Sequence, residues 1–286
     1  MLILPSWRRL RNIALLIITA LSLVLGFRAA HLAPLNWLWV LPLAYGAYVV
    51  WTSFWFTHPL RMRNWFPKGP VFASPVHEKA LFKSRDGLTL FGWFIPGRNH
   101  AAVILVHGLG SSGLALSVYA APLVSAGYNV LLMDLRAHGS SDGDTSTYGV
   151  LEAHDVAGAV DYLLARGDVD PEKIGVFGIS LGAQAAFRGA LHTPAIRALV
   201  LEGLGPADIQ DRVSPAPPED RANKGLMLWR RLLYTSLCFE QWVFNAFSGQ
   251  HPTPLITEIG KLMPRDARRA AACPILLIAC GKVEIA

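Results

Sequence analysis

The stretch KIGVFGISLGAQAAF, residues 173–187, decides the fold. Its first half, KIGVFGIS (173–180), is a short apolar run that predicts a buried strand, and the small residues after it predict a helix. The junction reads GISLG (178–182), with a glycine two positions from the serine on either side. A strand that turns this tightly into a helix has no room for a Cβ at the glycine positions, and the turn lifts the serine hydroxyl out of the sheet. The pattern therefore predicts that Ser180 is a nucleophile.

Strands and helices alternate along the chain on both sides of this junction. Apolar residues at helical spacing fill 150–167, which predicts a helix. Short apolar runs predict further strands at 88–96, 101–108, 129–139, 196–203 and 273–281. This alternation predicts a mostly parallel α/β sheet with helices on both faces. We therefore expect one α/β domain over residues 67–286.

Two loops that follow predicted strands are expected to surround the serine. One supplies an oxyanion donor and the other forms a wall of the site. HGLG (107–110) comes at the end of one strand, where the N–H of Leu109 can join the N–H of Leu181 as an oxyanion hole. The helix that begins after Ser180 adds the positive end of its dipole. We expect His107 to brace its loop. The charged residues of DLRAHGSSDG (134–143) are expected to fix a loop that walls the site.

With its motifs in this order, the chain resembles the α/β-hydrolase fold family. Within it, the chain resembles the membrane-anchored bacterial serine hydrolases related to serine aminopeptidase and BEM46-type hydrolases. The residues that carry the likeness are DGLTLFGWFIPG (86–97), VILVHGLGSSG (103–113), GYNVLLMDLRAHGSSDG (127–143), YGVLEAHDVAGAVDYL (148–163), DPEKIGVFGISLGA (170–183) and CPILLIACGKVE (273–284). The resemblance covers roughly residues 75–286. It implies hydrolysis of an ester, thioester or amide by a serine, an acid and a histidine, in that chain order.

The resemblance also points to an acid. In this family the acid follows the next-to-last strand, in a loop that begins with glycine and reaches the carboxylate three residues on. Gly281 and Glu284 match that spacing, so Glu284 takes the acid position. Glu202 and Asp208 are the alternatives, because some members of the fold carry the acid after the preceding strand.

The resemblance implies that the histidine follows the acid, beyond one more helix and a final strand. After Ser180 the sequence has only His192 and His251, and both precede Glu284. We expect His192 at the end of the helix after Ser180, and His251 on a solvated loop beside prolines. A serine hydroxyl without a base is a weak nucleophile at neutral pH. We therefore expect the sequence to be C-terminally incomplete, with its catalytic histidine beyond residue 286.

The first 66 residues differ from the rest by two long uncharged runs. IALLIITALSLVLGF (13–27) follows three arginines, and LNWLWVLPLAYGAYVVWTSFWFT (35–57) precedes three basic residues. A bilayer core needs about 20 helical residues, so we expect a transmembrane hairpin with spans at about 13–33 and 35–57. A cleaved signal peptide is the alternative for the first run. The basic flanks predict that both ends, and the catalytic domain, lie on the cytoplasmic side of the inner membrane.

Residues 204–269 carry no strand pattern and include an apolar helical stretch, GLMLWRRLLYTSLCFEQWVFNAF (225–247). An insertion at this point lies over the carboxyl edge of the sheet, where open α/β sheets bind their ligands. We therefore expect a lid. A third membrane contact is the alternative, which the arginines and glutamate of the stretch disfavour.

The composition narrows the class of function. Hydrophobic residues make up 52% and charged residues only 16%, which favours a chain with part of its length in a membrane. The net charge of +6 comes from scattered Lys and Arg without a nucleic-acid motif, so no nucleic acid is expected as a partner. The cysteines, Cys238, Cys273 and Cys280, lack the spacing of a disulfide framework or a zinc site. No metal or organic cofactor is expected.

The sequence thus predicts a membrane-anchored serine hydrolase that cleaves an ester, thioester or amide through an acyl-enzyme on Ser180. Closeness to a bilayer and an apolar lid favour lipid-like or other apolar esters as substrates. Two alternatives use the same residues. One is a catalytically inactive member of the fold that serves as a membrane-tethered binding module, and the other is an acyltransferase.

Overall fold

The computed structural model describes residues 17, 19–25, 37–59, 77–205, 224–251, 274–279 and 282–285. The chain divides into two compact units. The sheet unit comprises Pro59–Asp211 and Pro252–Ala286, and the helical unit comprises Met1–His58 and Arg212–His251. Sequence reasoning divided the chain differently, because it put the whole of 204–269 in the hydrolase domain.

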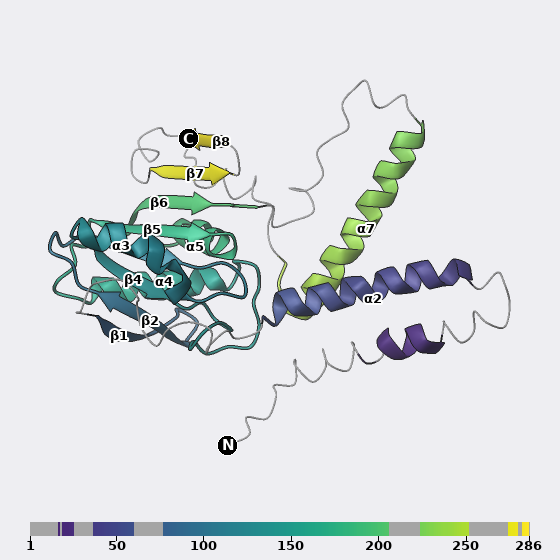
Figure 1. Ribbon diagram of the computed structural model, residues 1–286, viewed down its shortest axis with the longest axis horizontal. Coiled ribbons are helices and arrows are strands. Elements are labelled where there is room, and N and C mark those ends of the chain that lie inside the picture. The colour runs from purple at the N-terminus through teal and green to yellow at the C-terminus, as the bar shows by residue number, and fades with distance from the viewer. Residues whose placement is uncertain are drawn as a thin grey trace, which may run out of the picture. The chain divides into compact units, whose positions relative to one another are not determined.

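The sheet unit is built on one sheet of eight strands within the described residues, in the order β1-β2-β4-β3-β5-β6-β7-β8 (Figure 1). The strands are β1 (Glu78–Lys83), β2 (Thr89–Ile95), β3 (Ala102–Val106), β4 (Asn129–Met133), β5 (Ile174–Ile179), β6 (Ile196–Glu202), β7 (Ile275–Ala279) and β8 (Lys282–Ile285). The five strands from β4 to β7 in this order pair in parallel, while β1, β2 and β8 pair antiparallel. The mostly parallel sheet predicted from the sequence is confirmed, and β1 is an additional strand.

Helices cover both faces of the sheet, because the side chains of β2, β3, β4 and β5 alternate between two apolar clusters. The helices are η2 (Gly113–Leu116), α3 (Ser117–Ser125), α4 (Glu152–Leu164) and α5 (Leu181–Leu191). In β3, Ile104 and Val106 pack with residues of α4 and α5, and Leu105 packs with residues of η2 and α3. The alternation of inward residues therefore places α4 and α5 on one face and α3 on the other.

The strand register brings the ends of four parallel strands to one edge of the sheet. Val106, the last residue of β3, lies opposite Met133 of β4 and Gly178 of β5. Ile179 of β5 lies opposite Glu202, the last residue of β6. The loops after these strands therefore begin side by side, which is where open α/β sheets bind ligands.

The segment after β7 differs from expectation. Sequence reasoning predicted a loop from Gly281 to Glu284, but residues 282–285 form β8, which turns back and pairs antiparallel with β7. Glu284 lies opposite Leu277 in that pair. A tight return of this kind keeps the apolar β7 paired on both sides, a requirement that the motif spacing alone does not reveal.

The loop after β4 is fixed by a buried charge cluster. Arg136, with 3% of its side chain exposed, forms ion pairs with the fully buried Asp155 of α4 at 2.6 Å and with Asp86 at 2.7 Å. Burial alone would raise the pKa of Asp86, but hydrogen bonds from Arg136 and Ser84 outweigh burial and lower that pKa to about 2. Burial alone would lower the pKa of Arg136, but its hydrogen bonds to the two carboxylates outweigh burial and raise that pKa. The cluster ties the loop after β4 to α4 and to the turn before β2.

Replacing Arg136 by methionine is expected to lower the free energy of unfolding by about 3–5 kcal/mol, because the substitution leaves the carboxylate of Asp155 buried without its partner. Urea denaturation of the purified protein measures the change. The matched control is Arg85→Met. Its pair with Asp161 is well exposed, so the loss there should be at most about 1 kcal/mol. Equal losses in the two variants would contradict the role given to the buried cluster.

The helical unit contains α2 (Trp37–Thr57) and α7 (Lys224–Ser248), which pack against each other. Val49 of α2 and Val243 and Phe247 of α7 form its buried core. The Tyr45 hydroxyl donates a hydrogen bond of 2.8 Å to Glu240 across the pair. The predicted lid helix is thus part of the helical unit, and its role as a lid stays a prediction.

Among the helices of the described residues, none has the length and apolar character required of a membrane span. The first predicted span, 13–33, lies largely outside the described residues. The transmembrane hairpin therefore stays a prediction.

Candidate active site

Ser180 occupies a strained turn between β5 and α5. Its backbone has φ 53° and ψ −112°, a conformation that residues with a side chain rarely adopt. Its N–H donates to the carbonyl of Glu202 at 2.9 Å, and its carbonyl accepts from Gln184 at 3.1 Å. The hydroxyl makes no capping bond to the helix, and the residue is exposed. The turn thus presents the Ser180 hydroxyl at the carboxyl edge of the sheet.

The two glycines of the motif are required by backbone contact. A Cβ on Gly178 would lie 2.4 Å from the carbonyl oxygen of Gly182. A Cβ on Gly182 would lie 2.2 Å from the carbonyl oxygen of Val106 in β3. No side chain fits at either position, which is the clash that the sequence motif predicts.

The two predicted oxyanion donors, Leu109 and Leu181, belong to segments that adjoin Ser180. Leu181 is the first residue of α5, so its N–H belongs to the helix N-terminus, which carries the positive end of the dipole. The loop that holds Leu109 passes close by, because a Cβ on Gly108 would lie 3.5 Å from the Cβ of Ser180. Neither N–H has a hydrogen-bond partner within the described part of the chain. Their joint role as an oxyanion hole stays a prediction.

Two buried histidines hold the loop of Leu109 in place. His107 donates from Nδ1 to the carbonyl of Gly108 at 2.7 Å, and its Nε2 accepts from the N–H of Leu135 at 3.1 Å. His138 donates from Nδ1 to the carbonyl of Arg136, and its Nε2 accepts from the N–H of Gly110 at 3.0 Å. With both nitrogens of each ring bonded to backbone, these histidines brace the loops after β3 and β4.

Burial lowers the pKa of both bracing histidines to about 4, from 6.5. The two rings also lie near each other, with centroids 5.0 Å apart, so a charge on one disfavours a charge on the other. Each ring is therefore neutral at pH 7. As the pH falls from 6.5 to 4, the unfolded chain binds protons that the folded chain does not, so the free energy of unfolding falls with pH in this window.

We expect the free energy of unfolding to drop by about 2 kcal/mol for each bracing histidine between pH 7 and pH 4.5. Urea midpoints at the two pH values measure the drop. In His107→Gln the drop should shrink, whereas the exposed His192→Gln should keep that of the parent protein. A pH dependence that does not change in His107→Gln would show that the histidine titrates normally.

The candidate acids lie at different distances from Ser180. Glu202 ends β6 beside Ser180, as the hydrogen bond from the Ser180 N–H to its carbonyl shows. Glu284 shares a row of the sheet with Gly178, three strands away, which at strand spacing is about 14 Å. Asp208 and the side chain of Glu284 lie outside the described residues.

Of the two histidines that follow Ser180, His192 lies in the sheet unit and His251 in the helical unit. His192 caps the far end of α5, roughly 17 Å along the helix from Ser180. His251 belongs to the helical unit, where its ring lies 3.0 Å from the side-chain amide of Asn245. No hydrogen bond of the described residues joins a histidine to the Ser180 hydroxyl. Side chains that could together hold a metal ion do not gather anywhere in the described part of the chain.

Sequence reasoning missed Gln184, one turn into α5. Its side chain is fully buried, and its Nε2 donates to the carbonyl of Gly205, just after β6. Gln184 thereby ties the helix that begins at Ser180 to the loop that follows Glu202. The only signal in the sequence is one amide within a run of small and apolar residues.

The fold and the serine turn together define an α/β hydrolase. Residues 103–284 match the model of the alpha/beta hydrolase family, so the chain belongs to this family. The esterase Pf2001 of Pyrococcus furiosus has a similar structure, with a TM-score of 0.52 and 27% sequence identity over 78% of this chain and 76% of that one.

Two curated proteins are similar in sequence. An uncharacterized protein of Mycobacterium tuberculosis is 34% identical over 145 residues, which are 48% of this chain and 50% of that protein. The polyketide transferase ATR5 of Stachybotrys chlorohalonatus is 36% identical over 112 residues, 38% of each chain. The matched region of this chain thus spans half or less of the length of these relatives.

Proposed function

We propose that the protein is a serine hydrolase that cleaves an ester, thioester or amide bond through an acyl-enzyme on Ser180. The observation that carries the proposal is the strained, exposed Ser180 at the start of α5, with the loop that holds Leu109 passing close to it. Strain of this kind is kept where it serves a function. Membership of the hydrolase family and the similarity to an esterase support the same chemistry.

In the proposed reaction the Ser180 Oγ attacks the carbonyl carbon while a base takes its proton. The negative charge that develops on the carbonyl oxygen is stabilised by the N–H groups of Leu109 and Leu181. The alcohol, thiol or amine leaves with the proton from the base, and the acyl group stays on Ser180. Water then attacks the acyl-enzyme and releases the acid.

We also propose that the protein is associated with a membrane. The uncharged runs of the first 66 residues and their basic flanks support association with the inner membrane, with the catalytic domain on the cytoplasmic side. A site held beside a bilayer suits lipid-like or other apolar esters. Transfer of the acyl group to an acceptor other than water is a second candidate, which the similarity to a polyketide transferase favours.

A fluorophosphonate probe should label the full-length gene product, because the probe reacts with an activated serine. Ser180→Ala should abolish the labelling seen on a gel. The matched control is Ser140→Ala, which removes another exposed hydroxyl from a neighbouring loop and should label as the parent protein does. Labelling that survives Ser180→Ala would overturn the assignment of the nucleophile. A parent protein that never labels would favour the inactive binding module.

Among the acids we propose Glu202, because it adjoins Ser180 whereas Glu284 lies three strands away. Glu202→Gln should lower kcat/KM for a chromogenic ester on the order of 10⁴-fold, as loss of the triad acid does elsewhere. Glu284→Gln should lower it less than about tenfold. The reverse result would assign the acid to Glu284. A loss only in Asp208→Asn would assign it to Asp208.

A further inference from the structure

The helical unit exposes far more apolar surface than the sheet unit. Of the eighteen large apolar side chains that are exposed in the described part of the chain, fourteen belong to the helical unit. They are Ile17, Leu21, Val24, Leu25, Tyr45, Tyr48, Trp51, Phe56, Leu228, Leu232, Leu233, Tyr234, Phe239 and Trp242. An apolar surface of this extent marks a site that contacts a partner or a membrane.

Helix α7 contributes a continuous part of this surface. Its buried side packs on α2 through Val243 and Phe247. Beside that contact runs an exposed stripe, which we name the α7 stripe: Leu228, Leu232, Phe239 and Trp242. The spacings of four, seven and three residues put these side chains on one side of the helix. All four side chains are exposed, and Trp242 is the most exposed at 67%. Phe239 also lies against the ring of Tyr45 in α2. The exposed Thr235 lies on the same side of the helix, between Leu232 and Phe239.

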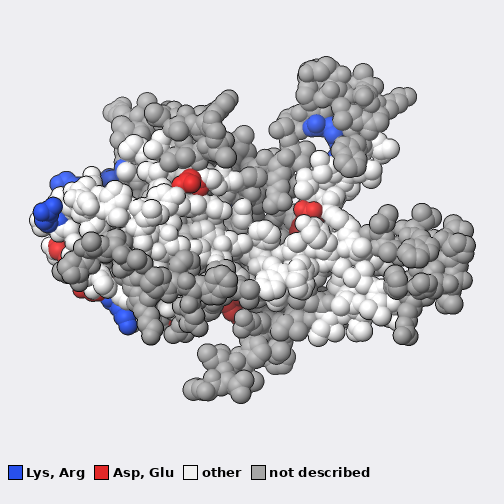
Figure 2. Space-filling model, viewed as in Figure 1, with Lys and Arg blue, Asp and Glu red and all other residues white. Residues whose placement is uncertain are grey.

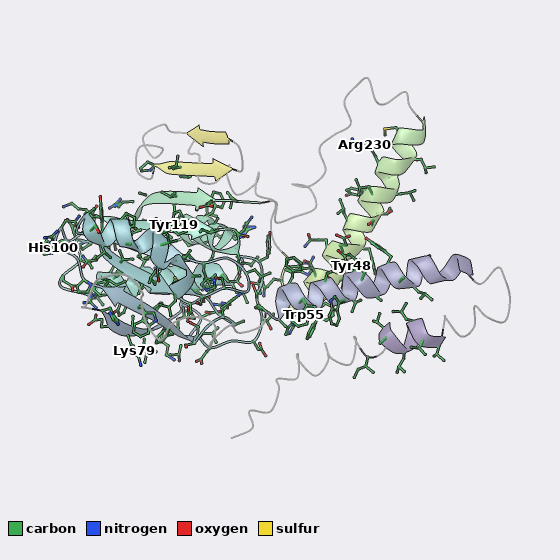
Figure 3. All side chains as sticks on the ribbon, viewed as in Figure 1. Tyr48, Trp55, Lys79, His100, Tyr119 and Arg230 are labelled. Carbon is green, nitrogen blue, oxygen red and sulfur yellow. The ribbon has the colours of Figure 1, made fainter. Side chains whose placement is uncertain are left out.

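The surroundings of the stripe fit lipid. The sequence of α2 has no charged residue, and in Figure 2 the visible surfaces of the described parts of α2 and α7 are mostly white. Within α2 and α7, the basic residues all lie in the first half of α7, where Figure 3 labels Arg230. Tyr48 and Trp51 expose aromatic side chains with a polar group on α2, a type enriched at membrane interfaces.

Three polar side chains of α2 and α7 bond to each other across the pair. Glu240 of α7 accepts its hydrogen bond from Tyr45 of α2, and Tyr45 also contacts the Ser236 hydroxyl. Polar side chains that bond across helices are the arrangement that an apolar surrounding favours. The pairing of α2 with α7 therefore leaves mainly apolar side chains to meet the outside.

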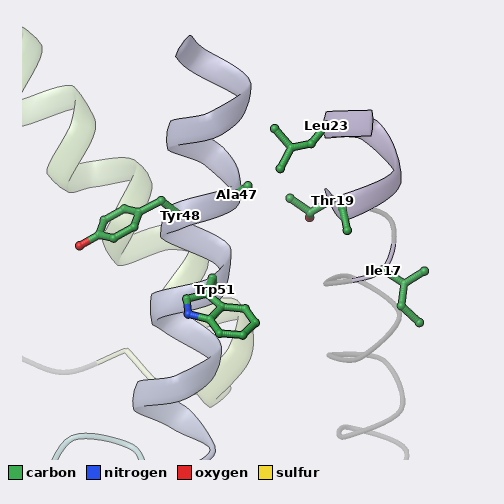
Figure 4. Close-up of a pocket in the computed structure, with 7 residues that line it drawn as sticks. Ile17, Thr19, Leu23, Ala47, Tyr48 and Trp51 are labelled. Carbon is green, nitrogen blue, oxygen red and sulfur yellow. The ribbon is translucent and has the colours of Figure 1, made fainter. Parts of the chain in front are cut away.

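A second apolar feature lies between α2 and the described helical residues near the N-terminus. A groove of about 470 Å³ separates the helical residues near the N-terminus from α2 (Figure 4). Almost all of its lining is apolar, and the Tyr48 hydroxyl points away from it (Figure 4): Ile17, Thr19, Ala20, Leu23, Ala47, Tyr48 and Trp51. The groove and the α7 stripe both belong to the helical unit, so its apolar surface extends over all three helical segments.

We propose that the α7 stripe contacts the acyl region of a phospholipid bilayer, so that α7 is a membrane-facing helix of the same surface as α2. The proposal rests on the proposed membrane association of the N-terminal residues. From the sequence, the arginines and the glutamate of the 225–247 stretch disfavoured a membrane contact. In the structure, Glu240 accepts a hydrogen bond from Tyr45, which lowers the cost of placing this glutamate in apolar surroundings. Arginine side chains can extend their charge to the interface while their stems stay in apolar surroundings.

Fluorescence from an environment-sensitive label tests the proposal. The full-length gene product, with its three cysteines replaced by alanine, carries a single new cysteine for an NBD label and is reconstituted into phosphatidylcholine vesicles. The test position is Leu232→Cys in the α7 stripe. Tyr48→Cys reports on α2. Val118→Cys, which is 71% exposed on the sheet unit, is the matched control.

Label at position 232 is expected to emit at shorter wavelength than label at position 118 and to lose fluorescence when the vesicles contain doxyl-labelled lipid. Label at 48 should behave like label at 232. Loss at 48 without loss at 232 would overturn the proposal for α7 and leave the membrane association intact. No loss at either position would overturn both. A blue shift at 232 that doxyl lipid does not quench would indicate contact with protein, such as a second copy of the chain, and would also overturn the proposal.

Discussion

The backbone of α5 comes so close to β3 that only glycine fits at position 182. The rest of the site depends on this contact. A Cβ on Gly182 would meet the carbonyl oxygen of Val106 at 2.2 Å. The crowding leaves Ser180 at a positive φ, where its hydroxyl leaves the sheet and its neighbour Leu181 begins the helix. One strained residue destabilises the fold by about 1–3 kcal/mol. The apolar packing on both faces of the sheet offsets this free energy.

The loops around this turn are held by groups that do no chemistry themselves. His107 and His138 are kept neutral by burial and use both ring nitrogens on backbone, so the loop of Leu109 has a fixed path. Arg136 fixes the next loop through Asp86 and Asp155. A site that must hold an oxyanion gains from such rigidity, because its donors are then in place before charge develops.

The sequence allowed the strand, the turn and the helix around Ser180 to be predicted, because the constraint is local. Glycines two positions from the serine have one physical reason, and the structure shows that reason directly. The closeness of Glu202 depends on the register of β5 with β6, which no local pattern records. The sequence likewise did not predict that α7 packs on α2. An amphipathic pattern shows that a helix has an apolar side, but not whether that side meets α2, a substrate or lipid. The strand at Lys282–Ile285 was missed because a family spacing favoured a loop there.

The most direct test of the account is to find the acyl group itself. Trypsin cuts after Lys173 and Arg188 and releases IGVFGISLGAQAAFR (174–188), in which Ser180 is the sole nucleophilic side chain. The full-length gene product is mixed with an activated ester, quenched in acid within milliseconds, digested at low temperature and mapped by mass spectrometry. If Ser180 forms an acyl-enzyme, this peptide carries the mass of the acyl group and loses it when the quench is delayed beyond substrate exhaustion. Turnover of the ester with this peptide unmodified at every time point would contradict the account.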